Sequence, residues 1–157
     1  MKRLLIILLM FAGITLCATA QEGLRINEVF EGHVVSKQFI RESLIKGDNL
    51  APYNLKVLHT AKCEANSRER ITMEQLFEED MKQRISDDNS NMEMESRDGH
   101  LYYAIVQIAD TKKGTHRYIC YQCRDRSSHF DITLVYMEGK ASLADLRKTF
   151  KKKSHII

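Results

Sequence analysis

The spacing of apolar residues changes from a helical period to a strand period between residues 86 and 92, and this change constrains the fold more than any other feature. Residues 72–86 carry apolar side chains at helical spacing, about every 3.6 residues. The segments over 92–137 are short and follow the two-residue period of strands, or are apolar throughout. Close strands joined by tight turns pair antiparallel. The pattern therefore predicts an α+β fold with an antiparallel β-meander.

The meander is predicted to contain four strands: Met92–Ser96, Leu101–Ala109, Arg117–Cys123 and Phe130–Met137. The second is apolar on both faces, which indicates a central strand, and the turn signal Arg97-Asp98-Gly99 precedes it. Upstream, Tyr53–Cys63 alternates as a strand does. Residues 37–46 suit either a strand or one helical face. We favour a strand there, because the turn signal Gly47-Asp48-Asn49 ends it.

Two amphipathic helices are predicted to cover the sheet. The first spans residues 72–86 and begins with a capping box of Thr72 and Gln75, with Ile71 and Leu76 as its hydrophobic staple. Its apolar stripe is expected to comprise Met73, Leu76, Phe77, Met81 and Ile85. The pairs Glu78–Lys82 and Asp80–Arg84 are expected on its solvated side.

The second helix spans residues 142–152 and starts at Ser142, with Asp145 at capping-box spacing. Leu143, Leu146 and Phe150 share one side of it. A short helix is also predicted over Leu24–Phe30, with Ile26, Val29 and Phe30 on one face. The residues expected in the core include Phe77, Leu101, Tyr103, Ile105 and Leu134.

The first twenty residues have the three parts of a secretory signal peptide. Lys2 and Arg3 precede an apolar run over Leu4–Leu16 that is too short to span a bilayer, and Ala18-Thr19-Ala20 fits a cleavage site. We therefore expect residues 1–20 to be removed, and an exported chain over 21–157, periplasmic or extracellular. The alternative is a lipoprotein acylated on Cys17. It is less favoured because Leu16 stands where a small residue normally precedes that cysteine.

The remaining chain has the length of a single domain. Its positive and negative charges nearly balance, so charge does not steer it to nucleic acid. No other segment is long and apolar enough to be a transmembrane helix.

Three cysteines remain after the signal peptide: Cys63, Cys120 and Cys123. The odd number leaves at least one thiol without an intramolecular partner. Cys120 and Cys123 could form a redox pair or half of a metal site. On a regular strand, however, they point to opposite faces about 10 Å apart, whereas a disulfide spans at most about 7 Å between Cα atoms. A bridge from Cys63 to either one requires neighbouring strands, so we favour three reduced thiols.

Other candidate sites have simpler interpretations. The potential metal ligands His59, Cys63, His116, Cys120, Cys123 and His129 lack the paired spacing of a zinc site. Five tyrosines in the meander could line a glycan or peptide surface, or pack as ordinary strand residues: Tyr102, Tyr103, Tyr118, Tyr121 and Tyr136. The basic residues over 147–153 suit a solvated helix C-terminus.

No catalytic motif is present: the sequence lacks Gly-x-Ser-x-Gly, His-Glu-x-x-His and a phosphate-binding glycine loop. We therefore assign no catalytic, metal-binding or cofactor-binding residue and expect a non-catalytic binding or interaction module. Its partner would be a protein or glycan of the cell envelope. The alternative is a thiol-redox or metal-binding protein that uses Cys120 and Cys123.

Three stretches together resemble a known family. They are residues 46–55 (KGDNLAPYNL), 98–104 (DGHLYYA) and 132–139 (ITLVYMEG) followed by Ser142-Leu143. The chain is similar to a family of small exported Bacteroidetes proteins with a domain of unknown function. This resemblance implies a Gram-negative envelope location and a single α+β domain, and it supplies no catalytic residue.

Overall fold

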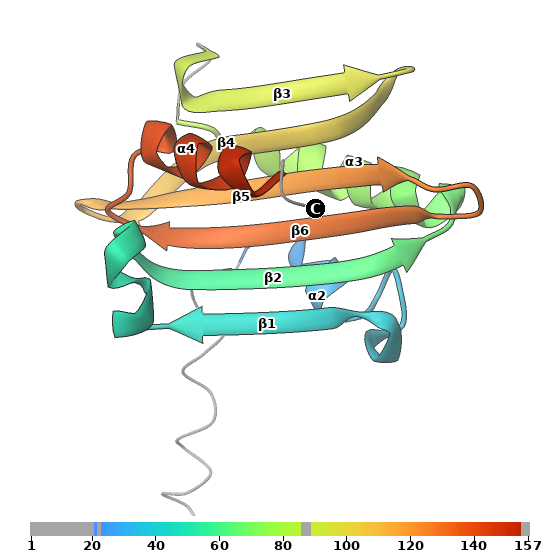
Figure 1. The fold of residues 1–157 in the computed structure, drawn as a ribbon, viewed down its shortest axis with the longest axis horizontal. Coiled ribbons are helices and arrows are strands. Elements are labelled where there is room, and N and C mark those ends of the chain that lie inside the picture. Colours follow the sequence, from blue (N-terminus) through green and yellow to red (C-terminus); the bar gives the residue numbers. More distant parts are fainter. Residues whose placement is uncertain (1–20, 22, 86–88, 155–157) are drawn as a thin grey trace, which may run out of the picture.

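The computed structural model describes residues 21, 23–85 and 89–154 of the 157-residue chain. Six strands form one open antiparallel sheet in the order β1-β2-β6-β5-β4-β3 (Figure 1). The strands are β1 (Arg41–Lys46), β2 (Leu55–Ala65), β3 (Met92–Arg97), β4 (His100–Lys112), β5 (Thr115–Asp125) and β6 (Phe130–Gly139). The α+β fold and the meander β3–β6 are therefore confirmed. The expected signal peptide and the expected helix end near residue 87 lie outside the described residues.

The helices lie in the connections and at the end of the described chain. The α-helices are α2 (Asn27–Phe30), α3 (Ser67–Met81) and α4 (Leu143–Ser154). Three short 3₁₀ helices are η1 (Lys37–Phe39), η2 (Asp48–Tyr53) and η3 (Asn89–Asn91). The expected strand over 37–46 is thus present from residue 41, after a single 3₁₀ turn.

The two larger helices cover opposite faces of the sheet, α4 in front and α3 behind in Figure 1. Alternate residues of β4, β5 and β6 enter two separate apolar clusters. One contains Ile119, Tyr121 and Leu134 together with Phe77 of α3, and α2 lies on this same face. The second cluster includes Leu143 and Leu146 of α4. Three layers result, and β5 and most of β6 are buried on both faces.

The N-terminal hairpin joins the meander through β2 and β6, which pair over Leu55–Ala65 and Phe130–Gly139. At one end of this pairing the two chains approach very closely. A Cβ atom on Gly139 would lie 2.4 Å from the carbonyl oxygen of Asn54. The same oxygen accepts hydrogen bonds from the backbone N–H groups of Lys140 and Ala141. Only glycine fits this junction, because the obstacle is backbone.

Helix α3 begins five residues before the predicted start. Asn66 is its N-cap and forms the capping box with Glu69: each side chain accepts a hydrogen bond from the other residue's backbone N–H. The box expected at Thr72 and Gln75 is wrong, since Thr72 lies inside the helix and its hydroxyl donates to the Arg68 carbonyl. The buried stripe is as expected from Met73 to Met81. Ile85 lies beyond the helix end and is 46% exposed.

Asp80 was expected on the solvated side of this helix, and that prediction is wrong. Its side chain is fully buried, and its two carboxylate oxygens accept hydrogen bonds from the backbone N–H groups of Arg25 (2.7 Å) and Ile26 (2.8 Å). Burial raises the pKa of Asp80, and the two backbone hydrogen bonds oppose that rise. Asp80 thereby docks the N-terminal segment on α3 and lets Ile26, Val29 and Phe30 enter the core.

The core predictions hold for four of the five residues. Phe77, Leu101, Ile105 and Leu134 are buried. Tyr103 is only half-buried and packs at the margin of the cluster beneath α4. At α4 the Ser142–Asp145 cap is confirmed, since the Asp145 N–H donates to Ser142 Oγ at 3.2 Å.

The corrected start of α3 gives a direct test. Asn66→Ala is expected to lower the free energy of unfolding by about 1 kcal/mol, because it leaves a first-turn N–H without its acceptor. Thr72→Ala, the matched control on the same helix, should change stability by less than about 0.5 kcal/mol. Urea unfolding of both variants measures the two effects. A larger loss in Thr72→Ala than in Asn66→Ala would contradict the observed cap.

Candidate functional site

A pocket with a volume of about 280 Å³ lies at one end of the sheet. It is bounded by the first turns of α3, the β3–β4 turn, the end of β5 and the start of β6. Its lining residues are mostly polar or aromatic: Arg70, Arg97, Asp98, His100, Leu101, Tyr102, Cys123, Asp125 and Phe130.

Two arginines stand over aromatic rings at this pocket. The Arg70 guanidinium lies 4.2 Å from the centre of the Phe130 ring, and that of Arg97 lies 3.4 Å from the centre of Tyr102. Arg97 also donates two hydrogen bonds to Glu95, at 3.0 and 2.9 Å. Stacking of this kind holds a guanidinium in place while its N–H groups remain available at the edge.

A buried polar group forms the wall behind Arg70. Glu74 lies one helical turn further along α3, and its side chain is only 10% exposed. Its Oε2 is 3.0 Å from Nδ1 of His100, which is the second residue after the β3–β4 turn residue Asp98. Its Oε1 is 3.7 Å from Arg70 Nε, which is an ion pair but too long for a hydrogen bond. Among the described residues, Oε1 and Nε have no hydrogen-bond partner.

Tyr121 and Cys123 continue this group along β5. Both face α3, and the Tyr121 hydroxyl is buried beside the Cys123 thiol without an oxygen or nitrogen partner in the described chain. Burial raises the pKa of both side chains. Buried polar atoms are normally hydrogen-bonded. Three unpaired ones lie here, on the pocket residue Arg70 and on Glu74 and Tyr121, which are neighbours of the pocket residues Arg70 and Cys123.

The charges lining the pocket balance. Two arginines, Arg70 and Arg97, face two aspartates, Asp98 and Asp125. Donors, acceptors and aromatic rings are thus present together without a dominant charge. Such a lining suits a neutral ligand that carries several hydroxyl groups better than a strongly charged one.

Sequence reasoning missed Arg70, Glu74 and His100 as site residues. Arg70 precedes the predicted start of the helix at residue 72, Glu74 is not part of the predicted apolar stripe, and His100 follows a predicted turn. The available signal was that His100 belongs to the DGHLYYA stretch that carried the family resemblance. The sequence could not show that His100 contacts Glu74, because this contact depends on how α3 packs on the sheet.

Cys120 and Cys123 point to opposite faces of β5, as expected. Cys120 is buried in the cluster beneath α4 and Cys123 in the cluster beneath α3. Cys63 and Cys123 both lie in register with Ile132, so β6 separates them by two strand spacings, about 10 Å. A disulfide between Cys63 and a cysteine of β5 is therefore too long to form, because β2 and β5 are not neighbouring strands. All three cysteines are free.

The structure disperses the other predicted candidates. His59 packs on Phe30 and lies between Gln21 and Glu42, whereas His116 pairs with Asp110 near the opposite end of β5. Tyr118, Tyr121 and Tyr136 are fully buried, so only Tyr102 and Tyr103 of the five tyrosines reach the surface. At the basic segment, Arg147 pairs with Glu93 and donates to the Met92 carbonyl.

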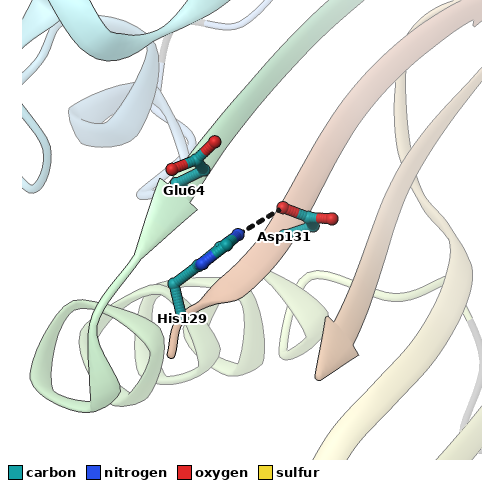
Figure 2. A group of neighbouring side chains, drawn as sticks. All are labelled: Glu64, His129 and Asp131. Carbon is teal, nitrogen blue, oxygen red and sulfur yellow. Dashed lines mark ion pairs between the residues drawn. The ribbon is translucent and has the colours of Figure 1, made fainter. Parts of the chain in front are cut away.

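One metal-type cluster does assemble in the described structure, with only one of the predicted ligands. His129 lies beside Asp131 and Glu64 at the ends of β6 and β2 (Figure 2). The atoms these side chains could offer to an ion lie within 4.8 Å of one another.

The pocket and the sheet belong to a region with a recognisable sequence profile, which matches residues 13–150. The chain belongs to DUF6108, a family of unknown function. This agrees with the expected domain of unknown function. The DUF6108 match covers all six strands, α3 and the pocket. No curated protein and no solved structure matches the chain. None of the described helices is long and apolar enough to cross a membrane.

The burial of the thiols predicts slow alkylation in the folded protein. Burial raises the pKa of Cys63 to about 11 and that of Cys120 to about 12. A pKa of about 12 leaves about one thiol in 10⁴ ionised at pH 8. Brief iodoacetamide labelling followed by peptide mapping should find Cys63 and Cys120 unmodified, and Cys123, which borders the pocket, modified first. Full labelling in guanidinium is the control. A native disulfide between Cys120 and Cys123 would contradict this geometry.

Proposed function

We propose that this DUF6108 protein is an exported, non-catalytic binding module of the bacterial cell envelope, and that its pocket holds a hydroxyl-rich ligand such as a sugar unit of a glycan. The observation that carries the proposal is the 3.7 Å gap between Arg70 Nε and Glu74 Oε1, two buried atoms behind the Arg70 side of the pocket. A hydroxyl group both accepts and donates a hydrogen bond. It can therefore satisfy a guanidinium and a carboxylate that do not reach each other.

The size and lining of the pocket support a small, uncharged ligand. Its volume of about 280 Å³ lies at the lower end of the range of ligand pockets, about 300–1,000 Å³. The Tyr102 and Phe130 rings supply apolar surface beside the polar groups. Lining charges that balance give no preference to an anion, which separates this proposal from a phosphate or nucleic-acid site.

The absence of catalysis is part of the proposal. Cys123 and His100 both line the pocket, but a reactive cysteine requires a lowered pKa. Burial instead raises the pKa of Cys123, and the hydrogen bond from Tyr121 and the charge of Arg70 only partly oppose that rise. Burial thus favours the neutral thiol, which suits packing and binding rather than nucleophilic attack.

The binding proposal is tested by titrating ¹⁵N-labelled protein with glucose, galactose, mannose and N-acetylglucosamine. At least one sugar should shift amide signals around Arg70, His100 and Cys123 and slow the alkylation of Cys123. Glu74→Gln should weaken this binding about tenfold, because it removes a charged acceptor. The matched control is Arg68→Ala, an exposed change on the same helix, which should leave the affinity unchanged.

The outcome that contradicts sugar binding is equally specific. Glucuronate and inorganic phosphate serve as charged competitors in the same titration. If only the anions shift the amide signals at the pocket, the ligand is anionic and the proposal of a neutral ligand is wrong. No shifts from any of these probes would remove the proposed glycan function.

The export proposal rests on the pattern of residues 1–20 and on the family resemblance. Protein recovered from the envelope of its host should begin at Gln21, and its intact mass should correspond to residues 21–157. N-terminal sequencing and mass spectrometry measure both. A lipid adduct on Cys17 would establish the lipoprotein alternative, and full-length protein in the cytoplasm would contradict export.

A further inference from the structure

Three potential metal ligands meet on the sheet face opposite the pocket. Glu64 is the penultimate residue of β2, Asp131 the second residue of β6, and His129 precedes that strand. Figure 2 shows the three side chains at neighbouring strand ends, with His129 Nε2 and Asp131 Oδ1 3.2 Å apart. One atom from each side chain lies within 4.8 Å of the others.

Residues outside the trio orient two of these ligands. Ser128 Oγ lies 3.1 Å from Nδ1 of His129, which leaves Nε2 facing Asp131. Arg126 Nε donates to Asp131 Oδ2 at 2.7 Å, which leaves Oδ1 facing His129. Metal-binding imidazoles and carboxylates characteristically have their second polar atom held by such an outer partner. The contacts of Ser128 and Arg126 with the far atoms of His129 and Asp131 have this form.

Glu64 gives the second, independent reason. It stands directly opposite Asp131 in the β2–β6 register, and like charges in that position destabilise a sheet. Arg126 binds the far oxygen of Asp131, and Arg124 is the residue opposite Asp131 in the β5–β6 register. Within the described residues, the Glu64 side chain has no hydrogen bond or ion pair. A cation between the two carboxylates would relieve their repulsion.

We propose that Glu64, His129 and Asp131 bind a divalent metal ion of the zinc type. One imidazole nitrogen and two carboxylate oxygens form a three-ligand set that leaves further positions for water or for a donor from a partner. With bonds of about 2.0 Å, two ligands of a tetrahedral zinc ion are about 3.3 Å apart. His129 and Asp131 already have that spacing, and the exposed Glu64 side chain has an oxygen within 4.8 Å of both.

The site is separate from the proposed sugar pocket. Asp131 and Glu64 lie on the α4 side of the sheet, whereas Phe130 packs against the cluster on the α3 side and lines the pocket. Loss of one site therefore leaves the other to be measured on its own.

The test is calorimetric titration of the protein with ZnCl₂, with MnCl₂ and CaCl₂ in parallel. Zn²⁺ should bind with a stoichiometry of one and more tightly than Mn²⁺ or Ca²⁺. His129→Asn and Glu64→Gln should each weaken Zn²⁺ binding by about tenfold or more. Circular dichroism of each variant in EDTA should match the wild type, which shows that the fold is retained.

His116→Asn is the matched control. His116 is another exposed imidazole in an ion pair, with Asp110 at 3.2 Å, but it has no second carboxylate in a metal-type cluster of the described residues. Its substitution should leave Zn²⁺ affinity unchanged. Zn²⁺ binding that survives His129→Asn, or no saturable Zn²⁺ binding by the wild type, would overturn the proposal, while the sugar titration would be unaffected.

Discussion

The burial of β5 and β6 on both faces is the constraint from which the rest of the structure follows. A strand that is apolar on each side must be covered twice. Helix α3 and the N-terminal segment cover one face, and α4 covers the other. Asp80 makes the first covering possible, since it binds the backbone N–H groups of Arg25 and Ile26 and so fixes the approach of the N-terminal segment.

Periodicity revealed most of this fold, because it reports which faces must be buried. The meander, the stripe from Met73 to Met81 and the Ser142 cap could all be predicted. The start of α3 could not: Asn66–Glu69 and Thr72–Gln75 both satisfy the capping pattern, and only the course of β2 up to Ala65 selects the first. Asp80 reads as solvated within its own helix, because its partners lie 54 and 55 residues away.

The candidate site was harder to predict for the same reason. Its polar wall combines Glu74 from a helix, His100 from a hairpin and Tyr121 from a strand. Their spacing in the sequence matches no catalytic or metal motif, because the tertiary packing of α3 on the sheet brings them together. The sequence did predict that Cys120 and Cys123 diverge, since that follows from the two-residue period of a strand. The geometry within one strand could be predicted, but the meeting of side chains from different helices and strands could not.

The pairing of β2 with β6 has a consequence for how the chain acquires its structure. Ala65 lies opposite Phe130, and Leu55 opposite Gly139. During synthesis, the β1–β2 hairpin therefore has no sheet to join until the last strand has emerged. Such non-local pairing slows folding. The complete sheet can thus form only after almost the whole polypeptide has been synthesised.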